Sequence, residues 1–178
     1  MILRGTCGKG IANVRPSLPD QIAEMGSAGV ERAWTDYIRT VGKGPFTLLH
    51  GDAHVGNSYM LPSGEFGFLD WACVRRGNWA FDVGYFLVSA LDVAERRRHE
   101  RELVEQYRQA LEVPLPDLPS RDEAWLRYRS TPAYGLAVWL ATSSSANYQS
   151  HPICSTKVKR YAAAFMDLDT PSALAILA

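Results

Sequence analysis

Residues 47–71 read TLLHGDAHVGNSYMLPSGEFGFLDW, and this stretch places dense polar chemistry between short apolar runs. It holds two histidines, two aspartates, one asparagine and four glycines. The runs FTLL, SYML and FGFL have strand length and are rich in β-forming residues, and the last two flank PSGE, a sequence typical of a hairpin turn. A plain hairpin needs few of these polar groups, so the stretch predicts a functional loop followed by a hairpin.

The hairpin brings two polar side chains together if its turn is centred on Ser63 and Gly64. Asn57 then lies directly opposite Asp70, with Cβ atoms roughly 4.5–5.5 Å apart. Both side chains offer hard oxygen ligands, which suit Mg²⁺ at roughly 2.0–2.1 Å. A register shifted by one residue would instead send the two side chains to opposite faces.

Asp52 lies five residues before Asn57, and Gly56 between them allows a sharp turn of the backbone. A carboxylate at this place can accept or orient the proton of a hydroxyl nucleophile. A neighbouring metal would neutralise the charge on a transferring phosphoryl group. The loop and hairpin thus combine a candidate base with two candidate metal ligands.

The order of these residues resembles a known family. The pattern H-G-D-x-H-x-G-N, an aspartate 13 residues later and then G-x-x-x-x-D before an apolar helix are similar to the C-terminal lobe of the aminoglycoside phosphotransferase and choline kinase-like family, relatives of the protein kinases. The resemblance implies that Asp52 is the catalytic aspartate and that Asn57 and Asp70 are Mg²⁺ ligands. It also implies ATP as co-substrate and the hydroxyl group of a small molecule as phosphate acceptor.

The same resemblance implies supporting roles for His50 and Asp82, which would hold the catalytic loop. Only 11 residues separate Asp70 from Asp82, which leaves no room for a long activation segment and favours a small-molecule kinase over a protein kinase. His54, Arg75 and Arg76 are candidates for contacts with phosphate or substrate. A histidine hydrogen-bonded in its turn and a solvated pair of arginines are the structural alternatives.

The chain outside this stretch is predicted to be mainly helical. Residues 28–41 carry apolar positions at helical spacing and end at a glycine, and the sequence after Trp79 has helical patterns almost throughout. We expect an α+β, mainly α-helical fold of the protein-kinase-like C-terminal lobe type, with a catalytic loop and β-hairpin packed on a helical bundle. Residues 1–18 are expected to form an irregular lead-in, and residues 19–178 the lobe.

Several helix ends are marked by local signals. Asn78 is a candidate cap for an apolar, buried helix, and Asp92 and Ser120 each precede a glutamate by three residues, which is the capping pattern of a helix N-terminus. Pro132 is expected to break the helix that begins after Ser120.

Composition excludes some partners. Lysine plus arginine and aspartate plus glutamate number 19 each, so no global charge favours nucleic acid or an anionic membrane surface. The longest apolar run, near AYGLAVWLA, is about half of the roughly 20 residues that a membrane span needs. Three widely spaced cysteines form no disulfide framework, and this usage favours a cytoplasmic protein.

The 51 residues before Asp52 do not show the pattern of a five-stranded sheet with a phosphate-gripping lysine. The chain therefore looks like the C-terminal lobe without its N-terminal nucleotide lobe, and a separate N-terminal lobe is a predicted partner. We expect the chain alone to bind ATP poorly. Two alternatives stay open: a non-catalytic kinase-like remnant or binding module, and a metal-dependent hydrolase in which His50, Asp52, His54 and Asp70 hold zinc.

Overall fold

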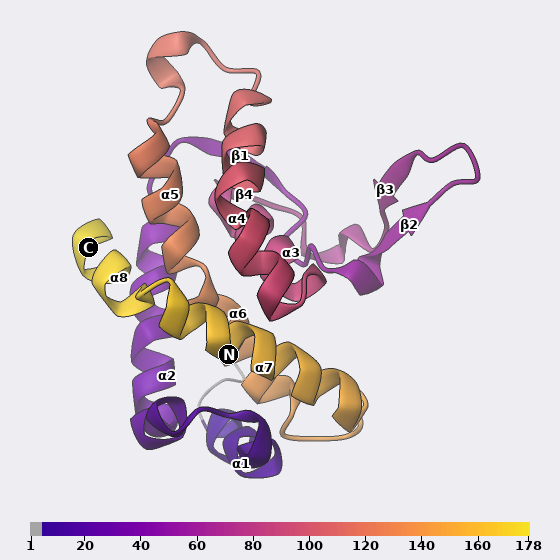
Figure 1. Ribbon diagram of the computed structural model, residues 1–178, viewed down its shortest axis with the longest axis vertical. Coiled ribbons are helices and arrows are strands. Elements are labelled where there is room, and N and C mark those ends of the chain that lie inside the picture. Colours follow the sequence, from indigo (N-terminus) through magenta and orange to yellow (C-terminus); the bar gives the residue numbers. More distant parts are fainter. Residues whose placement is uncertain (1–4) are drawn as a thin grey trace. The chain divides into compact units, whose positions relative to one another are not determined.

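The computed structural model describes residues 5–178, which form eight α-helices and four short strands (Figure 1). The strands make two separate antiparallel pairs, so the mainly helical α+β prediction is confirmed. The chain divides into two compact units: one combines the residues up to Thr40 with Arg129–Ala178, and the other is Val41–Tyr128. Among the described residues, no helix is both long enough and apolar enough to span a membrane.

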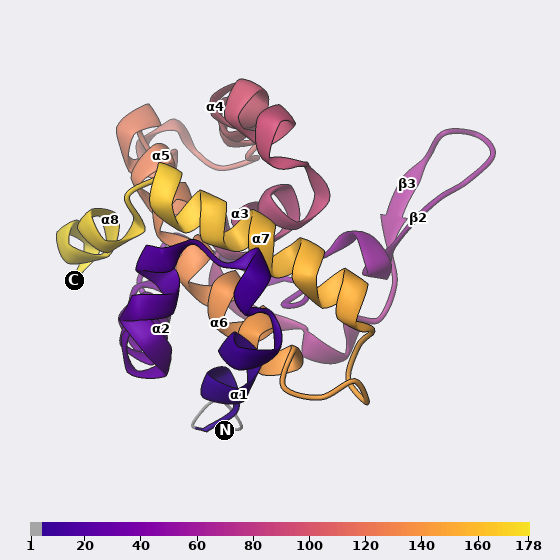
Figure 2. The same cartoon turned by 60° about the horizontal axis from the view of Figure 1, so that its bottom comes forward.

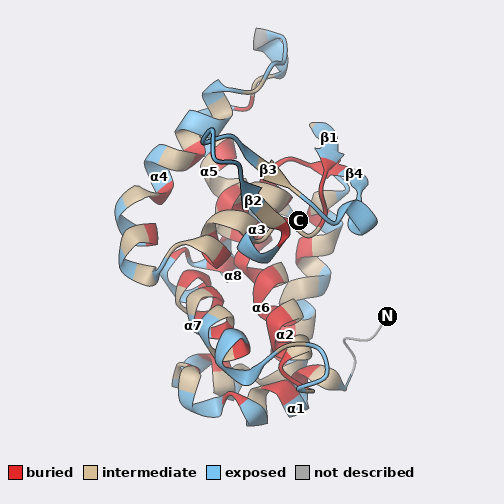
Figure 3. Cartoon of the chain, turned by 90° about the vertical axis from the view of Figure 1, so that its right-hand side faces the viewer, coloured by how far each residue is buried: buried red, intermediate tan, exposed pale blue. Residues whose placement is uncertain are grey.

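The first unit is entirely helical, and its centre is a helix that is apolar on all sides. Figure 3 shows buried residues along almost the whole of α6, which packs against α7 and α1. Its buried glycine, Gly135, leaves room for the ring of Tyr161 from α7. The helices of this unit are α1 (Thr6–Asn13), η1 (Arg15–Ser17), α2 (Asp20–Val41, kinked at Gly26), α6 (Pro132–Thr142), α7 (His151–Asp167) and α8 (Thr170–Leu177).

The irregular lead-in predicted for residues 1–18 is wrong for most of its length, because residues 6–13 form α1 and residues 15–17 form η1 (Figure 2). Residues 1–4 of that prediction lie outside the described part of the chain. Cys7, Gly10 and Val14 are buried at helical spacing, and a Cβ on Gly10 would overlap the carbonyl oxygen of Leu140. The glycines that suggested irregular chain instead permit close packing of two helices.

The second unit contains the loop and hairpin of interest. Its elements are β1 (Phe46–Leu49), η2 (Val55–Asn57), β2 (Ser58–Met60), β3 (Phe66–Phe68), η3 (Trp71–Cys73), β4 (Arg75–Asn78), α3 (Ala80–Ala90), α4 (Val93–Gln109), η4 (Leu115–Asp117) and α5 (Arg121–Ser130), whose last residues cross the unit boundary. The hairpin of β2 and β3 projects beyond α3 and α4 (Figure 1). Its base is anchored, because the rings of Phe66 and Phe68 lie 5.9 and 5.7 Å from that of Phe86 on α3.

The hairpin turn is one residue longer than predicted. Leu61 closes it by accepting a hydrogen bond from Gly64 N and donating one to the carbonyl of Glu65, so residues 62–64 form a three-residue loop. Gly64 has φ +88°, the left-handed conformation that such loops require at their last position.

This longer turn shifts the register by one residue. Ser58 pairs with Phe68, and Leu69 N donates to the carbonyl of Asn57 at 2.9 Å. The predicted pairing of Asn57 with Asp70 is therefore wrong, because Leu69 takes the position opposite Asn57. Asp70 follows one residue later, in a left-handed conformation (φ 60°, ψ 65°) that departs from strand geometry.

One strand was not predicted. β4 pairs antiparallel with β1, from Phe46 opposite Asn78 to Leu49 opposite Arg75. Its sequence, RRGN, has neither alternation nor β-forming residues, so pairing with β1 overrides a weak local propensity. The break before Pro132 and the buried helix α3 agree with the sequence prediction. The helix predicted for residues 28–41 is confirmed in that range, but α2 begins earlier, at Asp20, and is kinked at Gly26.

Other helices of the second unit support α3, the helix that carries the site residue Asp82. α3 packs against α4, and α4 is tied to α5 through a buried cluster of Arg96, Glu100 and Tyr128. Arg96 Nη1 lies 2.6 Å from Glu100 Oε2, and the hydroxyl of Tyr128 donates to the same oxygen at 2.9 Å. Burial and the Glu100 carboxylate raise the pKa of Tyr128 well above its usual value, so its hydroxyl keeps its proton.

Candidate active site

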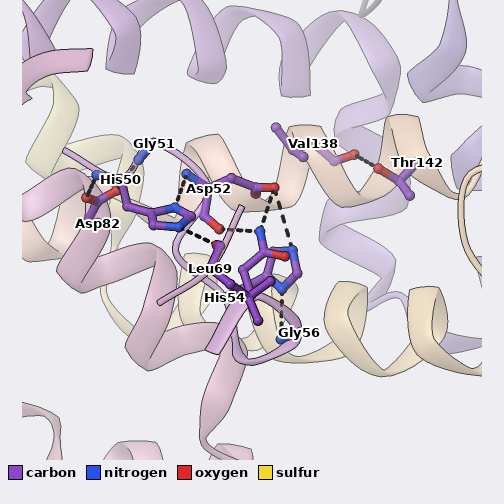
Figure 4. A network of polar contacts seen from close by, with 10 residues as sticks. His50, Gly51, Asp52, His54, Gly56, Leu69, Asp82, Val138 and Thr142 are labelled. Atoms are coloured by element: carbon purple, nitrogen blue, oxygen red, sulfur yellow. Dashed lines mark hydrogen bonds and ion pairs between the residues drawn. The ribbon is translucent and has the colours of Figure 1, made fainter. Parts of the chain in front are cut away.

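Asp82, in the first turn of α3, fixes the start of the polar loop (Figure 4). Its two carboxylate oxygens accept backbone hydrogen bonds from His50 N at 2.6 Å and Gly51 N at 3.0 Å. Burial raises the pKa of Asp82, and the two N–H donors offset this effect only in part. The contact explains how an acidic residue is tolerated in an otherwise apolar helix.

Gly51 can only be glycine here. Its φ of +85° is left-handed, and a Cβ would overlap the carbonyl oxygen of Cys73. This requirement for glycine at position 51 was not predicted from the motif. The available signal is the glycine itself, since a glycine between two polar residues of a functional motif is typical of a close backbone approach.

His50 links the loop to the chain that precedes Asp70. Its Nδ1 accepts a hydrogen bond from Asp52 N at 3.3 Å, so the proton of the neutral ring lies on Nε2, which donates to the carbonyl of Leu69 at 2.9 Å (Figure 4). The ring is buried and lies 4.7 Å from the ring of Trp71. Both nitrogens are occupied by the scaffold, which agrees with a supporting position and leaves neither for a metal.

Asp52 presents a partly exposed carboxylate, 38% accessible, beside two donor side chains. Asn57 Nδ2 donates to its Oδ2 at 3.2 Å, and His54 Nε2 lies 3.6 Å from the same oxygen. Burial alone would raise the pKa of Asp52, but His54, Asn57 and the more distant His50 outweigh it and hold this pKa below its usual value. Asp52 is therefore ionised at neutral pH.

Asn57 is nearly buried, and its amide nitrogen also donates to the backbone carbonyl of Asp52 at 3.0 Å. This contact fixes the orientation of the amide, because both donor bonds come from Nδ2. Its Oδ1 accepts no hydrogen bond from residues 5–178. An oriented amide oxygen of this kind is a suitable hard ligand for a cation.

Asp70 is exposed, and its carboxylate has no hydrogen-bond or ion-pair partner within residues 5–178. A non-glycine residue with positive φ is uncommon, and such conformations cluster at functional sites. The oxygens of Asp70 and Asn57 fit the ligand preference of Mg²⁺, whose other positions would be taken by water or phosphate.

A zinc site of the hydrolase type is not supported. Among the described residues, no three histidine, cysteine, aspartate or glutamate side chains are grouped so that they could hold one metal ion. The zinc alternative needs such a group from His50, Asp52, His54 and Asp70, and the described residues do not form one.

The two arginines of β4 pack on aromatic rings. The guanidinium carbon of Arg75 lies 4.1 Å from the ring centroid of Phe81, and that of Arg76 lies 4.7 Å from the ring centroid of Phe46. Both arginines are exposed, and their predicted contact with phosphate or substrate stays a prediction. His54, the third such candidate, lies beside Asp52, and its predicted contact with phosphate or substrate also stays a prediction.

A pocket of about 380 Å³ lies within the second unit, next to the loop that carries His50 and Ala53. Apolar and aromatic side chains make up most of its wall, and the polar residues His50 and Asp82 also line it; among its aromatic residues are Phe66, Phe68, Trp71 and Phe86. Trp71 and Phe66 are about half exposed, so the pocket is bordered by uncovered apolar surface.

Comparison with known proteins gives one match. Searches of curated proteins and of solved structures found no significant similarity. A family model described as "Phosphotransferase enzyme family" matches residues 9–129, which is more than half of the chain and includes the whole loop, hairpin and Asp82. The match confirms the family resemblance drawn from the motif. The chain therefore belongs to the phosphotransferase enzyme family.

Proposed function

We propose that this chain is the catalytic lobe of an ATP- and Mg²⁺-dependent small-molecule kinase, which transfers the γ-phosphate to a substrate hydroxyl. The carrying observation is the pair of Asp52 and Asn57, whose side chains are hydrogen-bonded within one loop while each keeps an oxygen that accepts no hydrogen bond from residues 5–178. Family membership supports phosphotransfer in general.

In this proposal Asp52 receives or orients the proton of the acceptor hydroxyl. Its lowered pKa keeps the carboxylate ionised at neutral pH, and its partial exposure leaves it open to a substrate. His50 and Asp82 act as supports, because they hold the backbone on both sides of the loop.

Asn57 and Asp70 are the proposed Mg²⁺ ligands. Bound Mg²⁺ would supply neutralisation of the charge on the nucleotide phosphates. The contribution of this chain is an amide oxygen oriented by Asp52 and a carboxylate that makes no competing hydrogen bond in the described structure.

We further propose that a nucleotide-binding lobe completes the site and covers the exposed apolar surface around the pocket, including Leu48, Phe66 and Trp71. We also propose a cytoplasmic location, which is supported by the absence of a disulfide among Cys7, Cys73 and Cys154. A titration of this chain with ATP, with and without Mg²⁺, tests the need for a second lobe: micromolar affinity would contradict it.

The function itself is tested by ATP consumption in the complete protein with Mg²⁺. Asp52→Ala should reduce turnover at least about 100-fold, because it removes the proposed base. Asp122→Ala, an exposed aspartate on α5, is the matched control and should leave turnover unchanged. Full turnover in Asp52→Ala would refute the assignment. Nucleotide binding with no turnover in the wild-type protein would instead identify a non-catalytic binding module.

A further inference from the structure

The second histidine of the loop has a defined proton position. His54 Nδ1 accepts a hydrogen bond from Gly56 N at 3.0 Å (Figure 4). In a neutral imidazole only one nitrogen carries hydrogen, so the proton must be on Nε2. That N–H faces Asp52 Oδ2 across 3.6 Å, which is longer than a well-formed hydrogen bond and short enough for the N–H dipole to interact with the carboxylate charge.

The ring of His54 is held from two sides. A Cβ on Gly56 would lie 2.8 Å from His54 Cε1 and 3.0 Å from Nδ1, so the ring occupies the space that a larger residue would fill. On another side, the ring of the buried Tyr85 meets it edge-on, with centroids 6.3 Å apart. The side chain of His54 is consequently only 21% exposed.

These contacts make the two oxygens of the Asp52 carboxylate unequal. Oδ2 receives the Asn57 amide at 3.2 Å and faces the Nε2–H of His54. Oδ1 receives no hydrogen bond from residues 5–178. In a carboxylate, the oxygen that accepts no hydrogen bond has the lone pair most available to a new proton, and here that oxygen is Oδ1.

We propose that His54 is a positioning residue, which holds Oδ2 of Asp52 together with Asn57 so that Oδ1 is the oxygen that takes the substrate proton. This inference rests on the proposed kinase function. In the reaction the hydroxyl O–H bond breaks and its proton passes to Oδ1, while the hydroxyl oxygen forms a bond to the γ-phosphorus of ATP. The bond from that phosphorus to the ADP oxygen breaks, and its electron pair stays on ADP.

Kinetics of four variants test the role. His54→Leu removes the donor and should lower kcat for ATP turnover by about 10- to 100-fold, since misplacement of a base is costly, while KM for ATP changes less than about 3-fold. His54→Gln keeps an N–H donor and should recover part of the loss. Gly56→Ala should lower kcat in the same direction by displacing the ring, although it leaves Asp52 and His54 chemically intact.

The double variant His54→Leu/Gly56→Ala should be no slower than His54→Leu alone, because both changes act through the same ring. Gly8→Ala is the matched control for the glycine change: a Cβ there makes only ordinary contacts at 3.9 Å, and turnover should not change. Additive losses in the double variant would overturn the role of His54. A raised KM for ATP with unchanged kcat in His54→Leu would also overturn it and would place His54 on phosphate.

Nitrogen-15 NMR of the imidazole rings gives a readout that needs no turnover. At alkaline pH the His54 ring should carry its proton on Nε2, and a proton on Nδ1 would overturn the proposal. Turnover of the two variants separates the kinase function from the positioning role. Turnover that survives Asp52→Ala contradicts the kinase function, whereas turnover that is lost in Asp52→Ala and unchanged in His54→Leu overturns only the positioning role.

Discussion

Replacing Asp82 with alanine should lower the free energy of unfolding more than any other aspartate-to-alanine change proposed for the second unit. The change leaves two backbone donors, His50 N and Gly51 N, without their carboxylate partner. Each hydrogen bond to a charged group contributes about 1.5–3 kcal/mol, so the two together contribute about 3–6 kcal/mol. The raised pKa of Asp82 shows that burial of its charge offsets part of this gain. We therefore expect a net loss of about 2–4 kcal/mol in the free energy of unfolding.

Urea denaturation at pH 7 measures this loss as a lower midpoint with an unchanged m value. For a chain of this size, the expected loss corresponds to a fall in Tm of roughly 4–15 °C. Asp92→Ala is the matched control: Asp92 accepts one exposed cap hydrogen bond from Glu95 N, and its loss should cost about 1 kcal/mol. A loss below about 0.5 kcal/mol for Asp82→Ala would refute the view that these two hydrogen bonds hold the loop in place.

Three further predictions concern other parts of the chain. Burial and the nearby Arg160 lower the pKa of Lys157 to about 8, so the folded state binds the proton of Lys157 less tightly than the unfolded state does. Lys157→Met should therefore raise the free energy of unfolding by about 1–2 kcal/mol at pH 7. Thermal melts should show this gain disappearing between pH 8 and 10.5. Cys73 is exposed, whereas burial and Glu31 raise the pKa of the Cys7 thiol to about 11. A thiol reagent should therefore modify Cys73 rapidly and leave Cys7 unmodified until the protein is denatured. Equal rates of modification would contradict the burial of α1. Gly10→Ala should destabilise the protein by about 3 kcal/mol in the same urea assay, and a neutral effect would show that α1 does not pack closely on α6.

Local capping signals in the sequence correctly predicted the starts of three helices, α3, α4 and α5. Asp92 and Ser120 each accept a hydrogen bond from the backbone N–H three residues later, as their capping patterns indicate. Asn78 accepts one from Ala80 N at the start of α3. These contacts depend on residues close together in the chain, so spacing alone specifies them.

Features that depend on distant partners were missed. PSGE fits both a two-residue and a three-residue loop, and the choice between them decides which residue lies opposite Asn57. β4 exists because β1 supplies its hydrogen bonds and Phe46 packs under Arg76. α1 exists because Gly10 fits against another helix. Neither partner can be identified from the local sequence.

The candidate site was predicted only in part from the sequence. The resemblance placed His50 and Asp82 in supporting positions, and the structure gives them contacts of that kind with the loop. Asn57 and Asp70 were predicted to share a cation because of a strand register that is wrong. The proposed metal site now depends on the chemistry of the two side chains and not on strand pairing.

The motif H-G-D-A-H-V-G-N can be understood position by position. Gly51 allows the chain to pass the Cys73 carbonyl, whereas Gly56 makes room for the ring of His54, so the two glycines serve different purposes. His50 and His54 both accept a backbone N–H at Nδ1, at 3.3 and 3.0 Å respectively, and this fixes the proton of each neutral ring on Nε2. One of these Nε2–H groups then faces the Leu69 carbonyl and the other faces Asp52. The same local device therefore orients the chain that leads to Asp70 and the carboxylate that would meet the substrate.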